Sequence, residues 1–250
     1  GIELVLVVHG NAPGTSWDKR RESYERFAAF VAFLAERWPS VRFFELWNEM
    51  DAGITDLFGA QRPGYAQFER GRCYAQMLQL AYPAIKAVRP DAWVLVGGIS
   101  SGGGIADFIR GMYEQGGRDD FDFMNIRTYG VPVNWPMLVC AFDARTAMGE
   151  YGDFNRPLWN TEFGIDAGNL WNAWKQADGD AFDQGQLGQW KACIEDALKY
   201  RLYEKVLPYQ FRAGNEACRA ELTDPKTGIR LPEGRTIDDY GFGILRSDGV

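Results

Sequence analysis

Two glutamates stand where predicted β-strands open into loops. Glu49 ends the sequence ELWNE at residues 45–49, and Glu162 lies within LWNTEFG at residues 158–164. In parallel α/β folds the functional groups lie at the carboxyl ends of strands, so carboxylates on two non-adjacent strands of one barrel can face each other across a substrate. That arrangement suits glycoside hydrolysis by double displacement, in which one carboxyl group protonates the leaving oxygen and the other attacks carbon.

Each glutamate also has an ordinary structural explanation. A single acid after a strand is commonly a solvated loop residue or a carboxylate at the start of a helix. The residue before Glu49 favours chemistry, because Asn48 can bond a sugar hydroxyl next to the reacting carbon. Such a contact strengthens as the oxocarbenium ion forms.

Alternating strands and helices must position these side chains. Apolar runs predict strands at 2–8, 41–47, 92–96, 122–127, 157–161 and 205–211, and helical spacing predicts helices at 24–38, 74–88, 105–113, 138–148 and 187–198. The alternation indicates βαβ units and a parallel sheet, either doubly wound or closed into a barrel. No internal repeat or linker marks a boundary, so residues 1–250 are predicted to form a single domain.

Composition excludes several classes of partner. The 27 basic and 34 acidic residues give a net charge of −7, which offers no basic patch for nucleic acid or for an anionic membrane. No apolar run approaches the roughly 20 residues of a membrane span. The cysteines are placed singly, so they are predicted to be small buried side chains rather than zinc ligands or a disulfide framework: Cys73, Cys140, Cys193 and Cys218.

Together the two motifs resemble those of the clan of retaining (β/α)8 glycoside hydrolases that includes families 5 and 39. Residues 46–49 are similar to its W-N-E motif, residues 158–164 to its second signature, and residues 239–245 to the segment after its last strand. The resemblance implies a (β/α)8 barrel of TIM type with Glu49 as acid/base, Glu162 as nucleophile, and no cofactor or metal. It further implies a β-linked oligo- or polysaccharide substrate, with an endo-acting cellulase or β-glycanase type and a secreted or periplasmic location favoured.

The remaining strand ends supply candidate substrate contacts. His9 stands where family 5 members commonly have a substrate-contacting histidine, although a structural histidine bonded to a loop carbonyl fits equally well. Tyr129 is expected to hold Glu162 through its hydroxyl. Arg127 replaces a histidine that the clan often shows, and it can contact substrate, keep the nucleophile ionised or form a structural ion pair.

Tryptophans in predicted loops are candidates for stacking on sugar rings, with Trp135 and Trp171 favoured. Trp38, Trp93 and Trp190 fall on predicted helix faces or within a strand, so core packing is expected for them. The glycine run at residues 97–104 fits neither phosphate-binding motif, and a flexible loop at the barrel rim is predicted.

Only six strands are predicted, whereas the barrel has eight. If Glu49 follows the fourth barrel strand, residues 4–8 form the third, and the first two βα units and the last helix are expected to be lacking. A fragment of a longer protein, or a homo-oligomer in which a second copy covers the exposed edge, is the expected consequence. Two other functions stay open: a non-catalytic or barely active carbohydrate-binding relative, and a phosphate- or nucleotide-dependent barrel enzyme.

Overall fold

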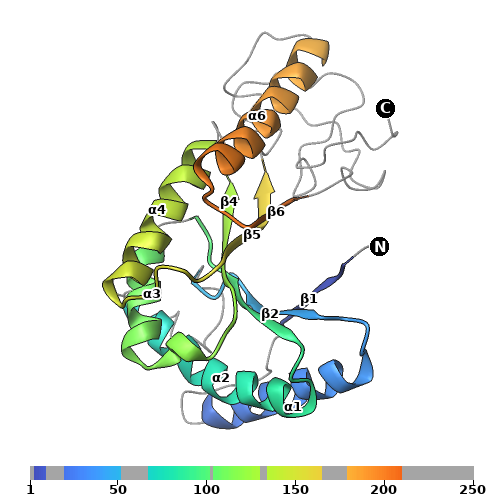
Figure 1. The fold of residues 1–250 in the computed structure, drawn as a ribbon, viewed down its shortest axis with the longest axis vertical. Coiled ribbons are helices and arrows are strands. Elements are labelled where there is room, and N and C mark those ends of the chain that lie inside the picture. Colours follow the sequence, from blue (N-terminus) through green and yellow to red (C-terminus); the bar gives the residue numbers. More distant parts are fainter. Residues whose placement is uncertain are drawn as a thin grey trace, which may run out of the picture. The chain divides into compact units, whose positions relative to one another are not determined.

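Strands and helices alternate along the chain (Figure 1). The computed structural model describes residues 3–9, 20–51, 67–101, 104–129, 134–164 and 179–209. Its elements are β1 (Val5–Val8), α1 (Arg20–Arg37), β2 (Phe43–Asn48), α2 (Gln67–Val88), β3 (Trp93–Gly98), α3 (Ile105–Glu114), the short 3-10 helix η3 (Gly117–Asp119), β4 (Met124–Tyr129), α4 (Asn134–Glu150), β5 (Leu158–Gly164), α6 (Gly179–Tyr200) and β6 (Lys205–Pro208). Every strand and helix predicted from periodicity has a counterpart, and α2 begins seven residues before the predicted start at residue 74.

The strands pair in parallel, as the alternation predicts. One sheet has the order β1-β2-β3, with both pairs parallel, and a second has the order β4-β5-β6. Parallel bridges join residues 95 and 99 of the β3 segment to residues 123 and 126 of the β4 segment. The first five residues of β2 are buried. That burial explains the almost continuous apolar run, because strands of a parallel sheet are covered on both faces.

The chain divides into two compact units. The first comprises Gly1–Arg127 and Cys140–Trp159, and the second comprises Thr128–Val139 and Asn160–Val250. The division falls within β4 and within β5, so each of these strands contributes residues to both units. The fold is therefore a mixed α/β arrangement with parallel pairing, and each unit is described separately below.

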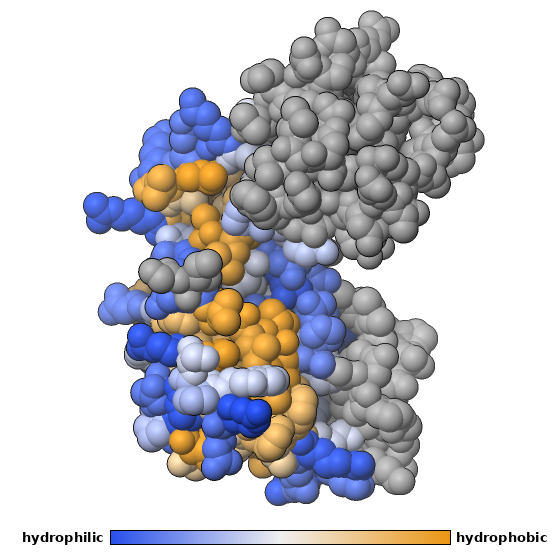
Figure 2. Space-filling model, turned by 90° about the vertical axis from the view of Figure 1, so that its right-hand side faces the viewer, coloured by the Kyte–Doolittle hydropathy of each residue, from blue (hydrophilic) through white to orange (hydrophobic). Residues whose placement is uncertain are grey.

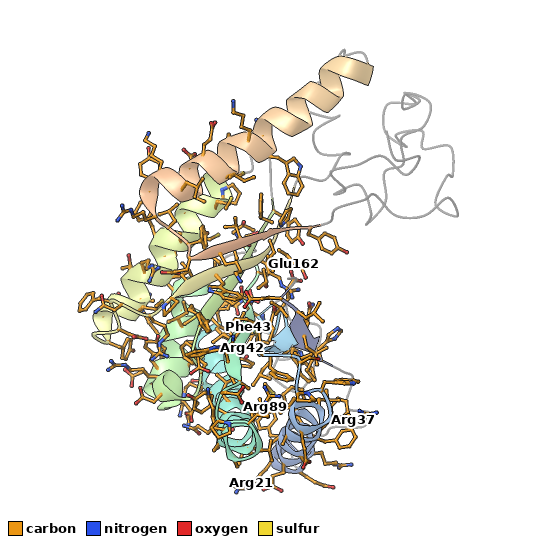
Figure 3. The ribbon with its side chains drawn as sticks, turned by 45° about the vertical axis from the view of Figure 1, so that its right-hand side comes forward. Arg21, Arg37, Arg42, Phe43, Arg89 and Glu162 are labelled. Atoms are coloured by element: carbon orange, nitrogen blue, oxygen red, sulfur yellow. The ribbon has the colours of Figure 1, made fainter. Side chains whose placement is uncertain are left out.

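Aromatic side chains from successive strands form a core in the first unit. Phe43, Leu95 and Trp159 are buried against one another, with Val5 and Phe123 packed beside them. The ring centroids of Phe43 and Trp159 lie 5.1 Å apart and those of Phe123 and Trp159 lie 4.8 Å apart, distances typical of attractive aromatic pairs. Figure 3 labels Phe43 within this unit. Side chains alternate along a strand, so Phe43 points to the same face of β2 as Glu45.

Helices α1, α2 and α3 pack closely in the same unit (Figure 1). Glycines allow the close approach of α2 to α3, because a Cβ at Gly71 would meet the carbonyl oxygen of Phe108, and a Cβ at Gly111 would meet the carbonyl oxygen of Phe68. Even an alanine at either position would force the two helices apart.

Two tryptophans predicted to lie in the core are partly exposed. Trp38 is 44% exposed because α1 ends at Arg37, which takes Trp38 off the helix face that the spacing suggested. Trp93 is 39% exposed at the first position of β3, where its ring lies beside the Lys86 ammonium and the Phe123 ring. Trp190 is buried, which confirms the prediction for that residue.

Cys73, Cys140 and Cys193 are buried and form no disulfide, as predicted, and Cys218 lies outside the described residues. Burial raises the pKa of Cys140 and of Cys193 to about 12. Within the described ranges no group of three His, Cys, Asp or Glu side chains is arranged to hold a metal ion. No described helix combines the length and the apolar character needed to cross a membrane.

Several large apolar side chains of the first unit are exposed to solvent. Leu4 and Val7, at the start of the chain and on β1, and Phe30 and Phe33, on α1, are all more than a third exposed. Figure 2 shows an apolar area flanked by hydrophilic residues on the face that it presents. In the described part of the chain β1 ends the strand order of its sheet.

Candidate active site

The end of β2 carries Asn48 and Glu49 in an unusual backbone conformation. Trp47 has a φ of 84° and Glu49 has a φ of 42°, so left-handed residues flank Asn48 on both sides. For residues other than glycine this region costs about 1–3 kcal/mol each and persists only where the surroundings enforce it. Asn48 and Glu49 are both partly exposed, whereas the five preceding residues are buried.

The hydroxyl of Tyr74, a fully buried residue of α2, stabilises this turn. It donates to the carbonyl oxygen of Leu46 at 2.6 Å and accepts the Gly97 N–H at 2.8 Å. The side chain therefore bridges β2 and β3 at the point where Trp47 interrupts the regular strand. Burial raises the pKa of the Tyr74 hydroxyl well above its usual range, so the hydroxyl stays protonated and able to donate.

Asp51 anchors the other end of the turn. Its carboxylate accepts the backbone N–H of Ser100 at 2.8 Å and the Ser100 hydroxyl at 2.7 Å. Its backbone carbonyl accepts hydrogen bonds from the side chains of Gln67 and Arg70 on α2. Burial raises the pKa of the Asp51 carboxyl, and the bonds from Ser100 oppose that rise. Glu49 is thus held between two anchored points in the sequence.

Arg127 lies behind Asn48 and is 1% exposed. Its Nη2 donates to Glu45 Oε1 at 2.7 Å, and its Nη1 donates to Asn48 Oδ1. Of the roles expected for Arg127, the structure shows the ion pair, and its burial is at odds with direct contact to a substrate. Residues three apart on a regular strand point to opposite faces. The left-handed Trp47 interrupts this alternation, which brings Glu45 and Asn48 to the same guanidinium.

Glycines of β3 make room for this arrangement. A Cβ at Gly98 would collide with the side chain of Arg127, and a Cβ at Gly97 would lie 2.5 Å from the carbonyl oxygen of Leu46. The Gly98 N–H also donates to Glu45 Oε1 at 3.0 Å. The prediction of a flexible loop was wrong for these two residues, because they complete β3 and are required by their neighbours on β2 and β4.

In the second unit Glu162 lies on β5 (Figure 3). The hydroxyl of Tyr129 donates to Glu162 Oε2 at 2.6 Å, so the hydrogen bond expected from the sequence is present. Both side chains are partly exposed, whereas the residues on either side of Glu162 are buried. Glu162 is therefore the one partly exposed residue of an otherwise buried strand.

Neighbouring contacts of the second unit fix these two side chains. Asn160 donates from Nδ2 to the Thr128 hydroxyl at 2.8 Å, and both residues are fully buried. The ring of Tyr209 meets the Tyr129 ring edge to face at 6.2 Å, and the Tyr209 N–H donates to the carbonyl of Phe163 at 2.9 Å. Tyr129 is held by a ring contact as well as by its hydroxyl.

The structure says less about the other predicted substrate contacts, His9, Trp135 and Trp171. His9 is exposed directly after β1. Trp135 was predicted to lie in a loop, but it is the second residue of α4, because that helix starts four residues earlier than the apolar spacing indicated. Its side chain lies outside the described residues, as does the whole of Trp171.

Sequence reasoning did not identify Glu45, Tyr74 and Asp51, whose contacts hold the turn that carries Asn48 and Glu49. Glu45 is a carboxylate in the middle of a buried strand, which is itself a signal, since buried charges require partners. Tyr74 was assigned only to the apolar face of a helix, and Asp51 was not singled out.

Solved structures of glycoside hydrolases have the same fold. A family 39 glycoside hydrolase from Bacteroides cellulosilyticus WH2 superposes with a TM-score of 0.61 and 21% identity, over 100% of this chain and 48% of that chain. A monomeric β-xylosidase from Caulobacter crescentus CB15 gives a TM-score of 0.53 and 17% identity over 92% of this chain and 44% of that chain. Fungal β-1,4-galactanases give a TM-score of 0.57 and 12% identity over 80% of this chain and 62% of that chain.

These likenesses confirm, at the level of the fold, the resemblance inferred from the two glutamate motifs. This chain spans less than half the length of the first two of these structures. No sequence profile of a known family matches the chain, and a search of curated proteins gave no match. At such identities a common fold is what the comparison shows, and the chemistry must be argued from the residues.

Proposed function

We propose that this chain carries the two catalytic carboxylates of a retaining β-glycoside hydrolase, with Glu49 as acid/base and Glu162 as nucleophile. The observation that carries the proposal is the 2.6 Å hydrogen bond from Tyr129 to Glu162, on a strand of a glycoside-hydrolase fold. A hydroxyl donor fixes the orientation of one carboxylate oxygen. Nucleophilic attack benefits from this, because the attacking oxygen must be aligned with the anomeric carbon. The W-N-E turn supplies the second carboxyl group.

In the first step Glu162 attacks the anomeric carbon while Glu49 gives its proton to the departing glycosidic oxygen. A covalent glycosyl ester forms and the C–O bond to the leaving sugar breaks. In the second step Glu49 takes a proton from water, the water oxygen attacks the anomeric carbon, and the Glu162 ester is released. Asn48, beside Glu49, bonds the hydroxyl next to the reacting carbon.

Direct attack constrains the distance between the two carboxyl groups. Retaining enzymes hold them about 5–5.5 Å apart, whereas inverting enzymes leave room for a water at roughly 6.5–9.5 Å. We expect the shorter separation in a crystal structure of the active protein with a bound glycan. A separation near 8 Å would exclude retention.

The proposed substrate is a β-linked oligo- or polysaccharide cleaved internally. Structures of similar fold include a β-xylosidase, a glucosidase and β-1,4-galactanases, so xylose, glucose and galactose linkages are the first to test. No cofactor or metal enters the proposed steps.

The test is a hydrolysis assay on a panel of β-glucans, β-xylans and β-galactans, together with 4-nitrophenyl β-glycosides of the same sugars. Product sizes separate internal from terminal cleavage. Glu162→Gln should abolish turnover and retain glycan binding, whereas Glu195→Gln, an exposed acid of α6, should leave turnover unchanged. Hydrolysis that survives Glu162→Gln would exclude this residue as nucleophile.

A carbohydrate-binding relative without catalysis is the competing function. The same panel distinguishes it, because such a protein binds glycans with equal affinity before and after Glu162→Gln and hydrolyses none of them. The presence of both Glu49 and Glu162 favours catalysis over this alternative, because glycan binding alone does not need the pair.

We further propose that residues 1–250 form one domain of (β/α)8-barrel type, in which β1 corresponds to the third barrel strand. The exposed apolar residues near β1 and on α1 support a covering partner, either the rest of a longer protein or a second copy of this chain. Light scattering of the purified chain separates the two, because only the second copy gives a defined oligomer.

A further inference from the structure

The pair formed by Glu45 and Arg127 is the most deeply buried ion pair among the described residues, with side chains 0% and 2% exposed. Removing two charges from water costs several kcal/mol for each ion, and their attraction offsets this only partly. Apolar side chains of similar size would serve a core at least as well. A buried pair at this position therefore calls for a purpose other than stability.

The hydrogen bond from Arg127 to Asn48 indicates that purpose. A guanidinium carries only donors, so the atom of Asn48 that faces Arg127 must be the amide oxygen. The Asn48 Nδ2 group consequently points away from Arg127. Without a fixed donor behind it, an amide side chain can rotate and present either its oxygen or its nitrogen.

Glu45 in turn fixes Arg127. Its Oε1 accepts Nη2 of Arg127 and the backbone N–H of Gly98, which ties the guanidinium to the β3 backbone. Because Gly98 has no side chain, the space beside it is open to Arg127, and a Cβ at this position would collide with the arginine. The orientation of Asn48 is thus determined by a chain of contacts through three strands.

We propose that Arg127, with Glu45 as its counter-ion, is a positioning residue that holds the Asn48 amide as a hydrogen-bond donor toward the glycan. This inference rests on the proposed function. The acceptor is the oxygen on the carbon next to the reacting centre. Because that contact strengthens in the transition state, its loss lowers kcat more than it raises KM.

The test compares a glycoside with its 2-deoxy analogue. The substrates are the 4-nitrophenyl β-glycoside that the wild type cleaves fastest and the same compound without the 2-hydroxyl. The double variant Glu45→Gln/Arg127→Met removes both buried charges, so neither is left without its partner. We expect kcat on the parent glycoside to fall by roughly 10- to 100-fold, because the lost contact is made most strongly in the transition state, and kcat on the 2-deoxy analogue to change by less than about threefold.

Asn48→Ala should give the same discrimination, and combining it with the double variant should add no further loss. Asp153→Asn/Arg156→Met is the matched control, since it removes another largely buried ion pair of the same unit. This control should lower the free energy of unfolding and leave the ratio of kcat on the parent glycoside to kcat on the 2-deoxy analogue unchanged. Equal losses on both substrates, or additive losses with Asn48→Ala, would overturn the positioning role.

A second measurement does not depend on hydrolysis. In 15N-labelled protein the Asn48 side-chain amide signals, assigned by their absence from Asn48→Ala, should shift in Glu45→Gln/Arg127→Met and stay in place in the control pair. Signals unmoved in the double variant would overturn the inference. If the signals shift in the double variant but the wild type hydrolyses no glycan, the positioning of Asn48 by Arg127 is supported and the proposed function is refuted.

Discussion

The two glutamates lie at strand ends that are held in opposite ways. At the end of β2 the backbone itself is distorted, and contacts from α2, β3 and β4 keep two left-handed residues in place around Asn48. At the end of β5 the strand continues with a regular buried pattern through Glu162, and the carboxylate is bonded by the hydroxyl of Tyr129. The first region fixes a loop, and the second fixes a side chain.

This difference fits the two tasks proposed for the carboxyl groups. An acid/base must accept and release a proton at an oxygen whose position changes with each substrate, and it works together with a neighbour that bonds the sugar. A nucleophile must stay aligned with one carbon atom. The comparison therefore predicts different consequences when each support is removed.

The largest loss of activity should come from removing either carboxyl group. Added azide then shows, by the configuration of its product, which role that group has. Glu162→Ala should slow hydrolysis of a 2,4-dinitrophenyl β-glycoside by about a thousandfold or more. Azide then attacks from the vacated face and yields the α-glycosyl azide. Glu49→Ala should still form the ester with this leaving group, which needs no proton, and azide should yield the β-glycosyl azide. Products of one configuration from both variants would refute the assignment of roles, and Glu36→Ala on α1 is the control.

Removal of the hydroxyl that orients Glu162 should have a smaller effect. Tyr129→Phe should lower kcat by roughly 10- to 100-fold, which corresponds to a hydrogen bond to a charged group, while the fold is retained. Tyr203→Phe is a matched control, because that hydroxyl donates to the Met137 carbonyl in the same unit. If both variants lose activity equally, Tyr129 has no special relation to Glu162.

Removal of the hydroxyl that bridges β2 and β3 should act on stability. Tyr74→Phe leaves the buried Leu46 carbonyl and Gly97 N–H without the bonds that they make to Tyr74. We expect the free energy of unfolding to fall by about 1–3 kcal/mol, measured by urea denaturation. Tyr151→Phe, whose hydroxyl bonds the exposed Glu114, should cost less than about 0.5 kcal/mol. Equal costs would mean that the turn is held by other contacts.

The smallest effect concerns the acid that anchors the turn. Burial raises the pKa of Asp51 in the folded chain, so the folded state binds this proton more tightly than the unfolded state does. The stability that this proton contributes is fully present below the usual pKa of 3.8 and is lost as pH rises through the raised pKa. Asp51→Asn cannot titrate, so its stability relative to wild type should increase with pH across that window and then stay constant. A decrease in the stability of Asp51→Asn relative to wild type across that window would contradict this.

Much of the fold could be predicted from residue spacing, because strands β2 to β5 are short and largely buried, and apolar residues recur every three or four positions along helices such as α2 and α3. Burial was predicted wrongly for residues at the ends of elements, where the exact boundary decides whether a side chain is covered. Trp38 lies one residue beyond α1, and Trp93 opens β3, so neither is covered although both fit an apolar pattern.

The candidate site could be predicted only in part. Glu49 and Glu162 could be predicted because each follows closely after an apolar run in the sequence. The hydrogen bond from Tyr129 to Glu162 was expected from the resemblance. The partner of Glu45 lies 82 residues away on β4 and could not be predicted, since the pairing depends on which strands are neighbours and on the reversal of side-chain direction at Trp47.

Gly98 and Arg127 restrict how this sequence can drift. An alanine at position 98 places a methyl group on the arginine side chain, so that first step displaces Arg127 from Glu45 and Asn48. Loss of the arginine first leaves the Glu45 carboxylate buried without its counter-ion, which is costlier still. Neither order of single substitutions is neutral. Among chains descended from a common ancestor, these two positions should therefore be exchanged together, with Glu45 changing in the same lineages, whereas Glu162 and Tyr129 stand outside this linked group.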